Sequence, residues 1–207
     1  MSANAHTPED LIRKAAIAPP DVAEDAARRF AERAAADGLV EVAYATTDSP
    51  FGPITLAATE RGLVRLNLPR YDADDFLARL SQEISPAILE LPARLDPVRR
   101  ELDDYFEGRL KKFSVPLDWQ LIHGFQEKVL RRTYAIPYGK TLTYGEVAAE
   151  AGNPRAFRAA ATACARNPIP ILVPCHRVLP STGGIGNYGG GPERKRALLE
   201  LEGAISP

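Results

Sequence analysis

The chain has 207 residues, of which 45% are hydrophobic and 26% charged, and its formal net charge is −1, a composition typical of an ordinary globular protein of one or two domains. No stretch approaches the ~20 apolar residues that cross a bilayer, and residues 1–6 lack the basic and apolar regions of a secretory signal, so we expect a cytoplasmic protein. The presence of two cysteines, Cys164 and Cys175, argues against a disulfide scaffold.

Charge is unevenly divided along the chain. Residues 123–207 contain 11 Lys and Arg against 6 Asp and Glu, a net charge of +5, which leaves −6 for residues 1–122. A basic half of this kind is typical of a surface that faces a polyanion. Solvated Arg-rich helices would give a similar excess, so charge alone leaves both interpretations open.

The first 38 residues are predicted to form a helical extension. Thr7, followed by proline and two acids, is a helix start, and Pro19-Pro20 ends that helix. A second helix is expected over residues 21–37, because its apolar side chains recur on one narrow stripe and Gly38 follows as a stop. We expect this helix to pack on the next domain, and the segment shows no chemistry of its own.

Residues 39–117 are predicted to form a scaffold domain. Three short β-type runs, 40–46, 54–58 and 63–68, are separated by turn residues, which predicts an antiparallel meander. Helices are expected at 71–81 and 95–106. Because this region contains neither His nor Cys, it shows no metal cluster and no catalytic constellation.

Residues 118–207 are predicted to be mainly helical. Helices are expected at 125–133, 144–151 and 154–165, and the tight Gly152-Asn153 link between the last two is typical of a helix-turn-helix. The last helix is rich in alanine and offers no Asn, Gln or Lys that could read base edges in a major groove. Its smooth face suits close approach to a minor groove, although alanine-rich helices also pack on other helices.

A thiol is the strongest candidate for chemistry. Cys175 and His176 follow the apolar run 169–173, which is short and bounded by prolines, so we expect a buried extended segment that brings both side chains to the edge of a core. Cysteine reacts as thiolate, and an adjacent imidazole can take the thiol proton. A single cysteine is, however, often an inert core residue.

Taken separately, the Cys-His pair and the helix-turn-helix would each fit a known class of protein. A Cys-His pair would serve a cysteine hydrolase, although such enzymes usually recruit a histidine distant in sequence. A helix-turn-helix would serve a DNA-binding regulator, although an alanine-rich recognition helix predicts little sequence preference.

Several short motifs follow one another in a fixed order. They are Ser49-Pro50-Phe51-Gly52-Pro53, Tyr105-Phe106-Glu107-Gly108, Tyr134-Ala135-Ile136-Pro137-Tyr138-Gly139-Lys140-Thr141, Thr143-Tyr144-Gly145-Glu146, Gly152-Asn153-Pro154-Arg155-Ala156-Phe157-Arg158-Ala159, Asn167-Pro168, Pro174-Cys175-His176-Arg177-Val178, Gly186-Asn187-Tyr188-Gly189-Gly190 and Leu198-Leu199-Glu200-Leu201-Glu202-Gly203. Together they resemble the O6-alkylguanine-DNA alkyltransferases, the methylated-DNA–protein-cysteine methyltransferases. The similarity is dense over 125–203, weaker over 40–117 and absent from 1–38.

The resemblance implies direct-reversal DNA repair with a single turnover. Cys175 would attack the alkyl carbon of an O6-alkylguanine in DNA, with O4-alkylthymine as an alternative substrate. His176 would act as the base through a water molecule, and Glu202 would orient the imidazole. Asn167 would brace the turns around the cysteine, and Tyr144 would hydrogen-bond the guanine at N3. No cofactor is expected.

The resemblance also implies binding to double-stranded DNA in the minor groove, with little sequence preference, and extrusion of the damaged nucleotide. Arg158 holds the position of the intercalating arginine, whereas Phe157 departs from the small or aliphatic residue expected there. The other residues expected to touch DNA or the lesion are Tyr144, Arg155, Ala156, Val178, Tyr188, Gly189 and Gly190.

Departures from relatives are also informative. Outside the cysteine loop the histidines are His6 and His123, so no structural zinc is expected. No cysteine precedes Cys164, so we expect no second, phosphotriester-repairing acceptor. Cys175 is present, which disfavours the alkyltransferase-like proteins that only flag damage. We expect no membrane partner and a monomer, with cooperative binding along DNA as the alternative.

These features predict an α+β fold. It would comprise an N-terminal antiparallel β-meander with helices, followed by a C-terminal helical domain that carries the helix-turn-helix and the active-site cysteine loop. The predicted domains are the helical extension 1–38, the scaffold domain 39–117 and the DNA-binding and alkyl-acceptor domain 118–207.

Overall fold

A computed structural model describes residues 20–68 and 73–206, and the chain divides into two compact units, residues 1–40 and 41–207. In the first unit, helix α2 (Pro20–Ala36) matches the helix predicted over 21–37. Gly38 follows with φ 72°, the left-handed conformation that makes it an effective stop. The helix predicted to start at Thr7 lies outside the described residues, and packing of α2 on the following domain stays a prediction.

The first half of the second unit contains a four-stranded sheet in the order β3-β2-β1-β4. Strands β1 (Val42–Thr47), β2 (Ile54–Thr59) and β3 (Gly62–Asn67) pair antiparallel, as the predicted meander requires. Strand β4 (Ile88–Glu90) pairs with β1 in parallel and was not predicted. Three residues are too short to show the alternation that identifies a strand in a sequence.

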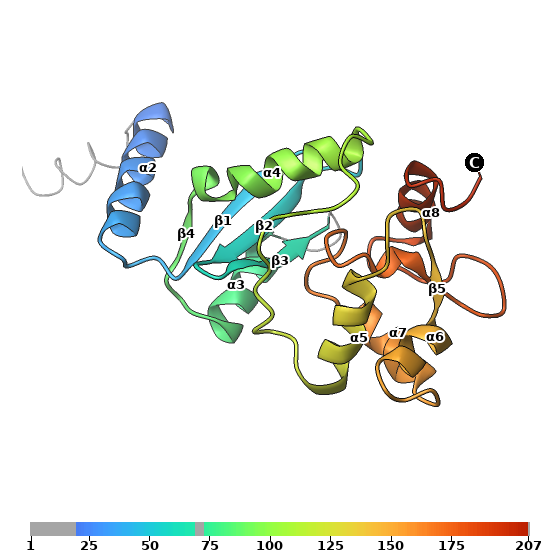
Figure 1. The fold of residues 1–207 in the computed structure, drawn as a ribbon. Coiled ribbons are helices and arrows are strands. Elements are labelled where there is room, and N and C mark those ends of the chain that lie inside the picture. The colour runs from blue at the N-terminus through green and yellow to red at the C-terminus, as the bar shows by residue number, and fades with distance from the viewer. Residues whose placement is uncertain (1–19, 69–72, 207) are drawn as a thin grey trace, which may run out of the picture. The chain divides into compact units, whose positions relative to one another are not determined.

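Helices α3 (Ala73–Glu83) and α4 (Pro92–Phe106) cover opposite faces of this sheet (Figure 1). The α3 face is a dry core of aliphatic and aromatic side chains: Val42, Ala57, Val64, Phe76 and Leu80. Helix α4 begins three residues before the predicted start because Pro92 occupies its first position, where a missing N–H costs nothing.

The second half of this unit is mainly helical and contains α5 (Gly124–Tyr134), α6 (Tyr144–Glu150), α7 (Phe157–Ala165) and α8 (Pro192–Leu201). Thr143 and Glu146 cap α6 reciprocally, which places Tyr144 at its first position. The predicted start of α7 at residue 154 is wrong. Residues 153–156 form a turn closed by a hydrogen bond from Ala156 N to Asn153 O (3.0 Å), and the helix begins after it.

The segment before Cys175 is buried as predicted, but it is not extended. Val173 N donates to Ile169 O (2.9 Å), and Ile171 has φ 74°, so the run folds into a turn. A short 3-10 helix η1 (Cys175–Arg177) follows, and strand β6 (Val178–Leu179) then pairs in parallel with β5 (Leu142–Thr143). Neither of these short strands was predicted.

The two halves of the second unit are in direct contact. Leu66 N in β3 donates to Pro168 O (2.8 Å), and the phenol of Tyr105 on α4 donates to Glu202 at the end of α8 (2.6 Å). Thus the sheet half supports residues near the cysteine. The observed elements agree with the predicted α+β class.

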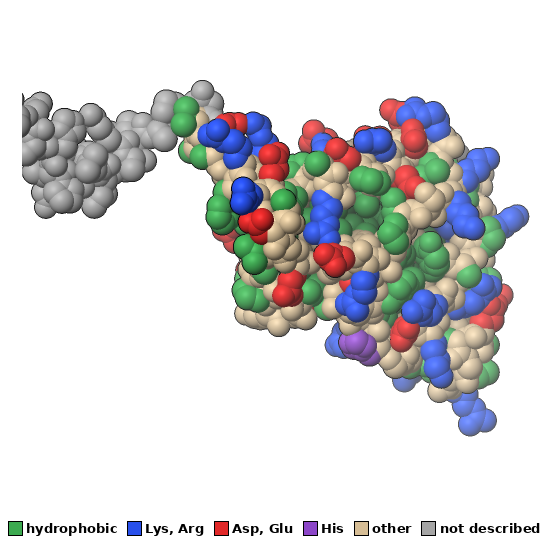
Figure 2. Space-filling model, turned by 60° about the vertical axis from the view of Figure 1, so that its left-hand side comes forward, with side chains coloured by type: hydrophobic (Ala, Val, Ile, Leu, Met, Phe, Trp, Pro, Cys, Tyr) green, Lys and Arg blue, Asp and Glu red, His purple; other side chains and the backbone are tan. Residues whose placement is uncertain are grey.

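The surface carries mixed charge. Figure 2 shows one face, on which Lys and Arg side chains are interspersed with Asp and Glu instead of forming a single patch. Within the part of the chain that the structure describes, no helix has both the length and the apolar character needed to span a membrane.

Candidate active site

The side chain of Asn167 organises the turn that presents Cys175. Its Oδ1 accepts from Ile169 N (3.0 Å), and its Nδ2 donates to Val173 O (2.8 Å) and to Cys175 Sγ (3.3 Å). One amide therefore closes the turn at both ends and also contacts the thiol. The left-handed Ile171 lies inside this turn, an uncommon conformation for a β-branched residue that surrounding structure must maintain.

The thiol of Cys175 is almost completely buried, with 5% of the residue exposed. Burial raises the pKa of Cys175, and the hydrogen bond from Asn167 and the charge of Lys195 offset this only in part. Because thiolate is the reactive form, the resting thiol needs a nearby base to take its proton.

His176 follows Cys175 and is fully buried. Its Nε2 lies 2.8 Å from Glu202 Oε1. Burial lowers the pKa of His176, and the hydrogen bond and charge of Glu202 restore only part of it, so the imidazole is neutral at neutral pH. A carboxylate at Nε2 selects the tautomer with the proton on that nitrogen. Nδ1 is buried and has no hydrogen-bond partner among the described residues, which makes it the atom able to accept a proton.

Glu202 is the centre of a buried ionic network. Arg177 Nε and Nη2 donate to its two carboxylate oxygens at 2.8 Å each, and Tyr105 Oη donates to Oε1 at 2.6 Å. Burial alone would raise the pKa of Glu202, but hydrogen bonds from His176 and Arg177 outweigh it and bring the pKa down to about 2. Glu202 is therefore ionised and positions the imidazole.

The Tyr138-Gly139 segment packs tightly against this network. Arg177 Nη1 donates to Ile136 O (2.6 Å), and Gly139 N donates to Glu202 Oε2 (3.3 Å). Gly139 has φ 71°, and a Cβ there would lie 2.8 Å from Glu202 O. Glycine is required at this position because both the conformation and the close approach exclude a side chain.

Lys195 is a second buried cation next to the thiol. The residue is fully buried, and its Nζ donates to Val178 O (2.7 Å) and lies 5.9 Å from the ring centroid of Tyr144. Burial lowers the pKa of Lys195, whereas the charges of Cys175 and Cys164 raise it. The ammonium group is therefore placed to stabilise a thiolate at Cys175.

A cavity of about 1090 Å³ lies against Cys175. Its walls come from the N-terminal residue of α6, from one face of α7 and from the loop before α8, and they include Tyr144, Ala161, Thr162, Tyr188, Gly189 and Gly190. Burial, followed by the charges of Cys164 and Cys175, raises the pKa of Tyr144 to about 12, so its phenol stays a hydrogen-bond donor. The cavity thus joins the thiol, a phenol and a glycine-rich loop.

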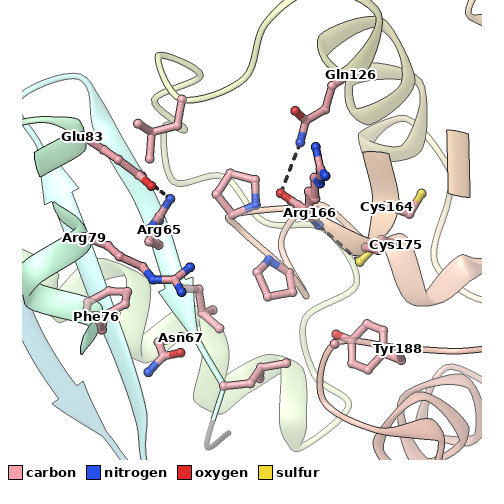
Figure 3. Close-up of a pocket in the computed structure, with 18 of the residues that line it drawn as sticks. Arg65, Asn67, Phe76, Arg79, Glu83, Gln126, Cys164, Arg166, Cys175 and Tyr188 are labelled. Carbon is pink, nitrogen blue, oxygen red and sulfur yellow. Dashed lines mark hydrogen bonds and ion pairs between the residues drawn. The ribbon is translucent and has the colours of Figure 1, made fainter. Parts of the chain in front are cut away.

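A second cleft, of about 680 Å³, reaches Cys175 from the sheet side. Arg65 and Arg79 line it from β3 and α3, and Cys175 and Tyr188 lie on the opposite wall (Figure 3). Tyr188 stands edge-on to the His176 ring, with 6.5 Å between centroids, and its buried hydroxyl has no hydrogen-bond partner among the described residues. Cys175 and Tyr188 therefore line both the cavity and the cleft.

The residues predicted to bind DNA occupy three environments. Arg155, Arg158 and Gly189 are exposed, and Ala156 is half-buried at the position preceding α7. Gly190 is half-buried in the cavity wall. Val178 is fully buried, and its carbonyl already accepts from Lys195, so contact of this residue with DNA stays a prediction.

Sequence reasoning missed Arg177, Tyr105 and Lys195. Signals for all three existed: Arg177 follows His176 directly, and Tyr105 lies in a motif of the resemblance. Lys195 precedes Leu198 and Leu199 by three and four residues, the spacing of one helix face, and both leucines are buried. In the described ranges, no group of three His, Cys, Asp or Glu side chains could hold a metal ion.

Two family models match the chain. Residues 42–119 match the 6-O-methylguanine DNA methyltransferase, ribonuclease-like domain, and residues 124–204 match the 6-O-methylguanine DNA methyltransferase, DNA binding domain. A methylated-DNA–protein-cysteine methyltransferase of Mycobacterium tuberculosis is 41% identical over 167 residues, which is 79% of this chain and 94% of that protein. One from Methanosarcina acetivorans is 40% identical over 78% of this chain and 98% of its own length.

Solved structures give the same match. The crystal structure of Mycobacterium tuberculosis OGT in complex with DNA superposes with a TM-score of 0.67 at 40% identity, covering 80% of this chain and 95% of that one. An O6-methylguanine-DNA methyltransferase from Pyrococcus kodakaraensis has a TM-score of 0.55 at 22% identity, over 78% of this chain and 99% of its own, and shares the fold.

Proposed function

The chain belongs to the 6-O-methylguanine DNA methyltransferase family, and from this premise we propose that it repairs DNA by moving the alkyl group of an O6-alkylguanine onto its own Cys175. The observation that carries this proposal is a buried thiol that faces a cavity, touches Asn167 and is followed by a histidine bound to an ionised carboxylate. O4-alkylthymine is a second candidate substrate.

The reaction is a displacement at carbon. The Cys175 proton passes to His176 Nδ1, through a bridging water because no direct hydrogen bond joins Nδ1 to Sγ among the described residues. The thiolate then attacks the alkyl carbon, an S–C bond forms, the C–O6 bond breaks, and the electron pair leaves on the guanine. The phenol of Tyr144 stabilises this charge by donating to guanine N3, and the proton that His176 took from the thiol finally passes to the guanine anion and neutralises it.

The imidazolium formed in this step is stabilised by Glu202, whose carboxylate is already ionised and held by Arg177 and Tyr105. Lys195 also favours the thiolate through its positive charge. No group in the described site is placed to cleave the resulting thioether, so each protein molecule reacts once. No cofactor enters the scheme.

We further propose that the substrate is double-stranded DNA, bound in the minor groove by α7 with little sequence preference. Apart from Phe157, the exposed α7 positions carry Arg158, Ala159, Thr162 and Ala165, which offer small or flexible side chains to a narrow groove. An alkyl group on O6 faces the major groove, away from a protein bound in the minor groove, so the nucleotide is extruded into the cavity beside Cys175. The protein acts as a monomer, and cooperative assembly on DNA is the alternative.

Intact-mass analysis after incubation with an O6-methylguanine duplex tests this function. We expect one added methyl group per chain, mapped by peptide analysis to Cys175, and no further turnover. Cys175→Ala should remove the adduct while DNA binding persists, and Cys164→Ala should still acquire it on Cys175.

Other results would identify the alternatives. A catalytic turnover without a protein adduct would indicate a hydrolase, and sequence-selective binding without transfer would indicate a regulator. Methyl groups on Cys164 would contradict the assignment of the acceptor. An O4-methylthymine duplex run in parallel distinguishes the two substrates.

A further inference from the structure

The first residue of α7, Phe157, is a large apolar side chain placed at the surface, with 49% of it exposed. The rest of this helix is small: six of the seven residues that follow Arg158 are alanine or threonine. The Phe157 ring protrudes from a helix whose other side chains are mostly small. Binding of a partner over the ring would be favourable, because it would remove apolar aromatic surface from water. Phe157 therefore requires an explanation that packing within the chain does not supply.

Helical spacing places Phe157 near the cavity beside Cys175. Residues four apart lie on the same face of a helix, so Phe157 precedes Ala161 and Arg158 precedes Thr162 by one turn each. Ala161 and Thr162 both line that cavity, as do Cys164 and Ala165 one turn further on. Phe157 and Arg158 are thus side by side at the N-terminal end of the helix face that forms the cavity wall.

The two side chains already interact. The guanidinium carbon of Arg158 lies 5.6 Å from the centroid of the Phe157 ring, within cation–π range. No carboxylate among the described residues pairs with Arg158. Packing on the ring therefore limits the orientations of the guanidinium and leaves its charge available to a polyanion.

We propose that Phe157 and Arg158 act together as a wedge, in which the Phe157 ring stacks on the base next to the extruded nucleotide while Arg158 enters the space it leaves. This inference rests on the proposed function and adds a positioning residue to it. Apolar wedges that insert between base steps from the minor groove are an established way to hold unstacked DNA. The surface of a flat aromatic ring also accepts any base, which agrees with weak sequence preference.

The test compares two substrates of the same protein. Single-turnover rates are measured for an O6-benzylguanine duplex and for free O6-benzylguanine base, which needs no extrusion, in the wild type, Phe157→Ala, Phe157→Leu and Arg158→Ala. Stacking on one base is worth a roughly tenfold effect. We therefore expect Phe157→Ala to lower the duplex-to-free-base rate ratio roughly tenfold, with Phe157→Leu intermediate. Tyr134→Ala, which removes an exposed aromatic side chain from α5, is the matched control.

A fluorescent base analogue placed next to the lesion reports stacking directly. Binding of the wild type should change its emission, and Phe157→Ala should reduce that change. An unaltered or increased rate ratio in Phe157→Ala, or an unaltered emission change, overturns the wedge. Absence of any adduct on wild-type Cys175 after incubation with the O6-methylguanine duplex would instead contradict the proposed function, so the two failures are distinguishable.

Discussion

The sheet half of the second unit, residues 42–119, and the helical half, residues 124–204, bury different kinds of side chain. In the described part of the sheet half, the buried polar side chains are the uncharged Thr55, Asn67 and Ser85 and, at its C-terminal end, the carboxylate of Asp118, which pairs with the exposed Arg61. The helical half buries four ionisable side chains around the thiol, namely His176, Arg177, Lys195 and Glu202.

This difference separates stability from function. Burying an ion costs several kcal/mol, and replacing a buried ion pair by apolar residues is often neutral or stabilising. If the interior of the helical half served stability alone, we would expect it to be apolar, as the core around α3 is. The charged core is explained instead by what it positions, because each of its members is bonded to a neighbour of Cys175 or acts on the charge of its thiol.

Breaking the network at its centre should have the largest effect. Glu202→Gln leaves the guanidinium of Arg177 without a countercharge and the imidazolium without support, so we expect transfer to slow by about 100-fold and the free energy of unfolding to fall by about 3 kcal/mol. Single-turnover transfer and urea unfolding measure the two effects. Glu200→Gln, two residues earlier in the last turn of α8 and partly exposed, is the control; equal losses in both variants would contradict the role of the network.

The lowered pKa of Glu202 predicts how the free energy of unfolding depends on pH. Its folded-state pKa of about 2 lies below the ordinary value of 4.5, so its contribution is complete above about pH 4.5 and disappears as the pH falls through 2. Urea unfolding between pH 2 and 6 should therefore show a loss of stability that Glu202→Gln lacks over this window. Parallel curves for the two proteins would show that Glu202 is not the group that titrates.

Removal of the buried positive charge of Lys195 should have a smaller effect on the rate of transfer. Lys195→Met takes away the charge that favours the thiolate, so the pKa of Cys175 should rise further and transfer to free O6-benzylguanine should slow roughly tenfold at neutral pH. The rate should recover as the pH is raised. Arg196→Met, an exposed neighbour on α8, is the matched control. A loss of rate that stays constant with pH would indicate a packing defect instead.

Removal of a hydrogen bond between the two halves should have a modest effect on the rate of transfer. Tyr105→Phe removes the hydrogen bond that α4 in the sheet half donates to Glu202. A charge-assisted hydrogen bond of this kind contributes about 1.5–3 kcal/mol, and we expect a roughly fivefold slower transfer because Arg177 still holds the carboxylate. The exposed phenol of Tyr134 provides the comparison as Tyr134→Phe. If Tyr105→Phe transfers at the wild-type rate, the sheet half does not support the reaction.

A cavity in the dry core should have the smallest effect on transfer. Leu80→Ala creates a void in the α3 face of the sheet and should lower the free energy of unfolding by about 2–5 kcal/mol. The transfer rate should stay close to wild type at temperatures where the variant is folded, since Leu80 touches no part of the network around Cys175. A slowed transfer in folded Leu80→Ala would show that the core of the sheet half also affects the reaction, and would contradict the distinction between the two halves.

The sequence by itself determined the α+β class, the three-strand meander, the main helices and the chemical identity of the candidate nucleophile. These are local properties: apolar periodicity, caps, turn residues and the adjacency of Cys175 and His176 can be read within a window of a few residues. The burial of the run before Cys175 also followed from its composition.

Only the tertiary structure decided which side chains meet. Glu202 joins Tyr105, 97 positions earlier in the chain, to His176 and Arg177, and Asn167 reaches Sγ only because residues 169–173 form a turn instead of a strand. Such contacts carry no local signature, and a left-handed isoleucine contradicts local preference. The short parallel strands β4, β5 and β6 escaped prediction for the same reason: their hydrogen bonds come from partners distant in sequence, and two or three residues show no period of their own.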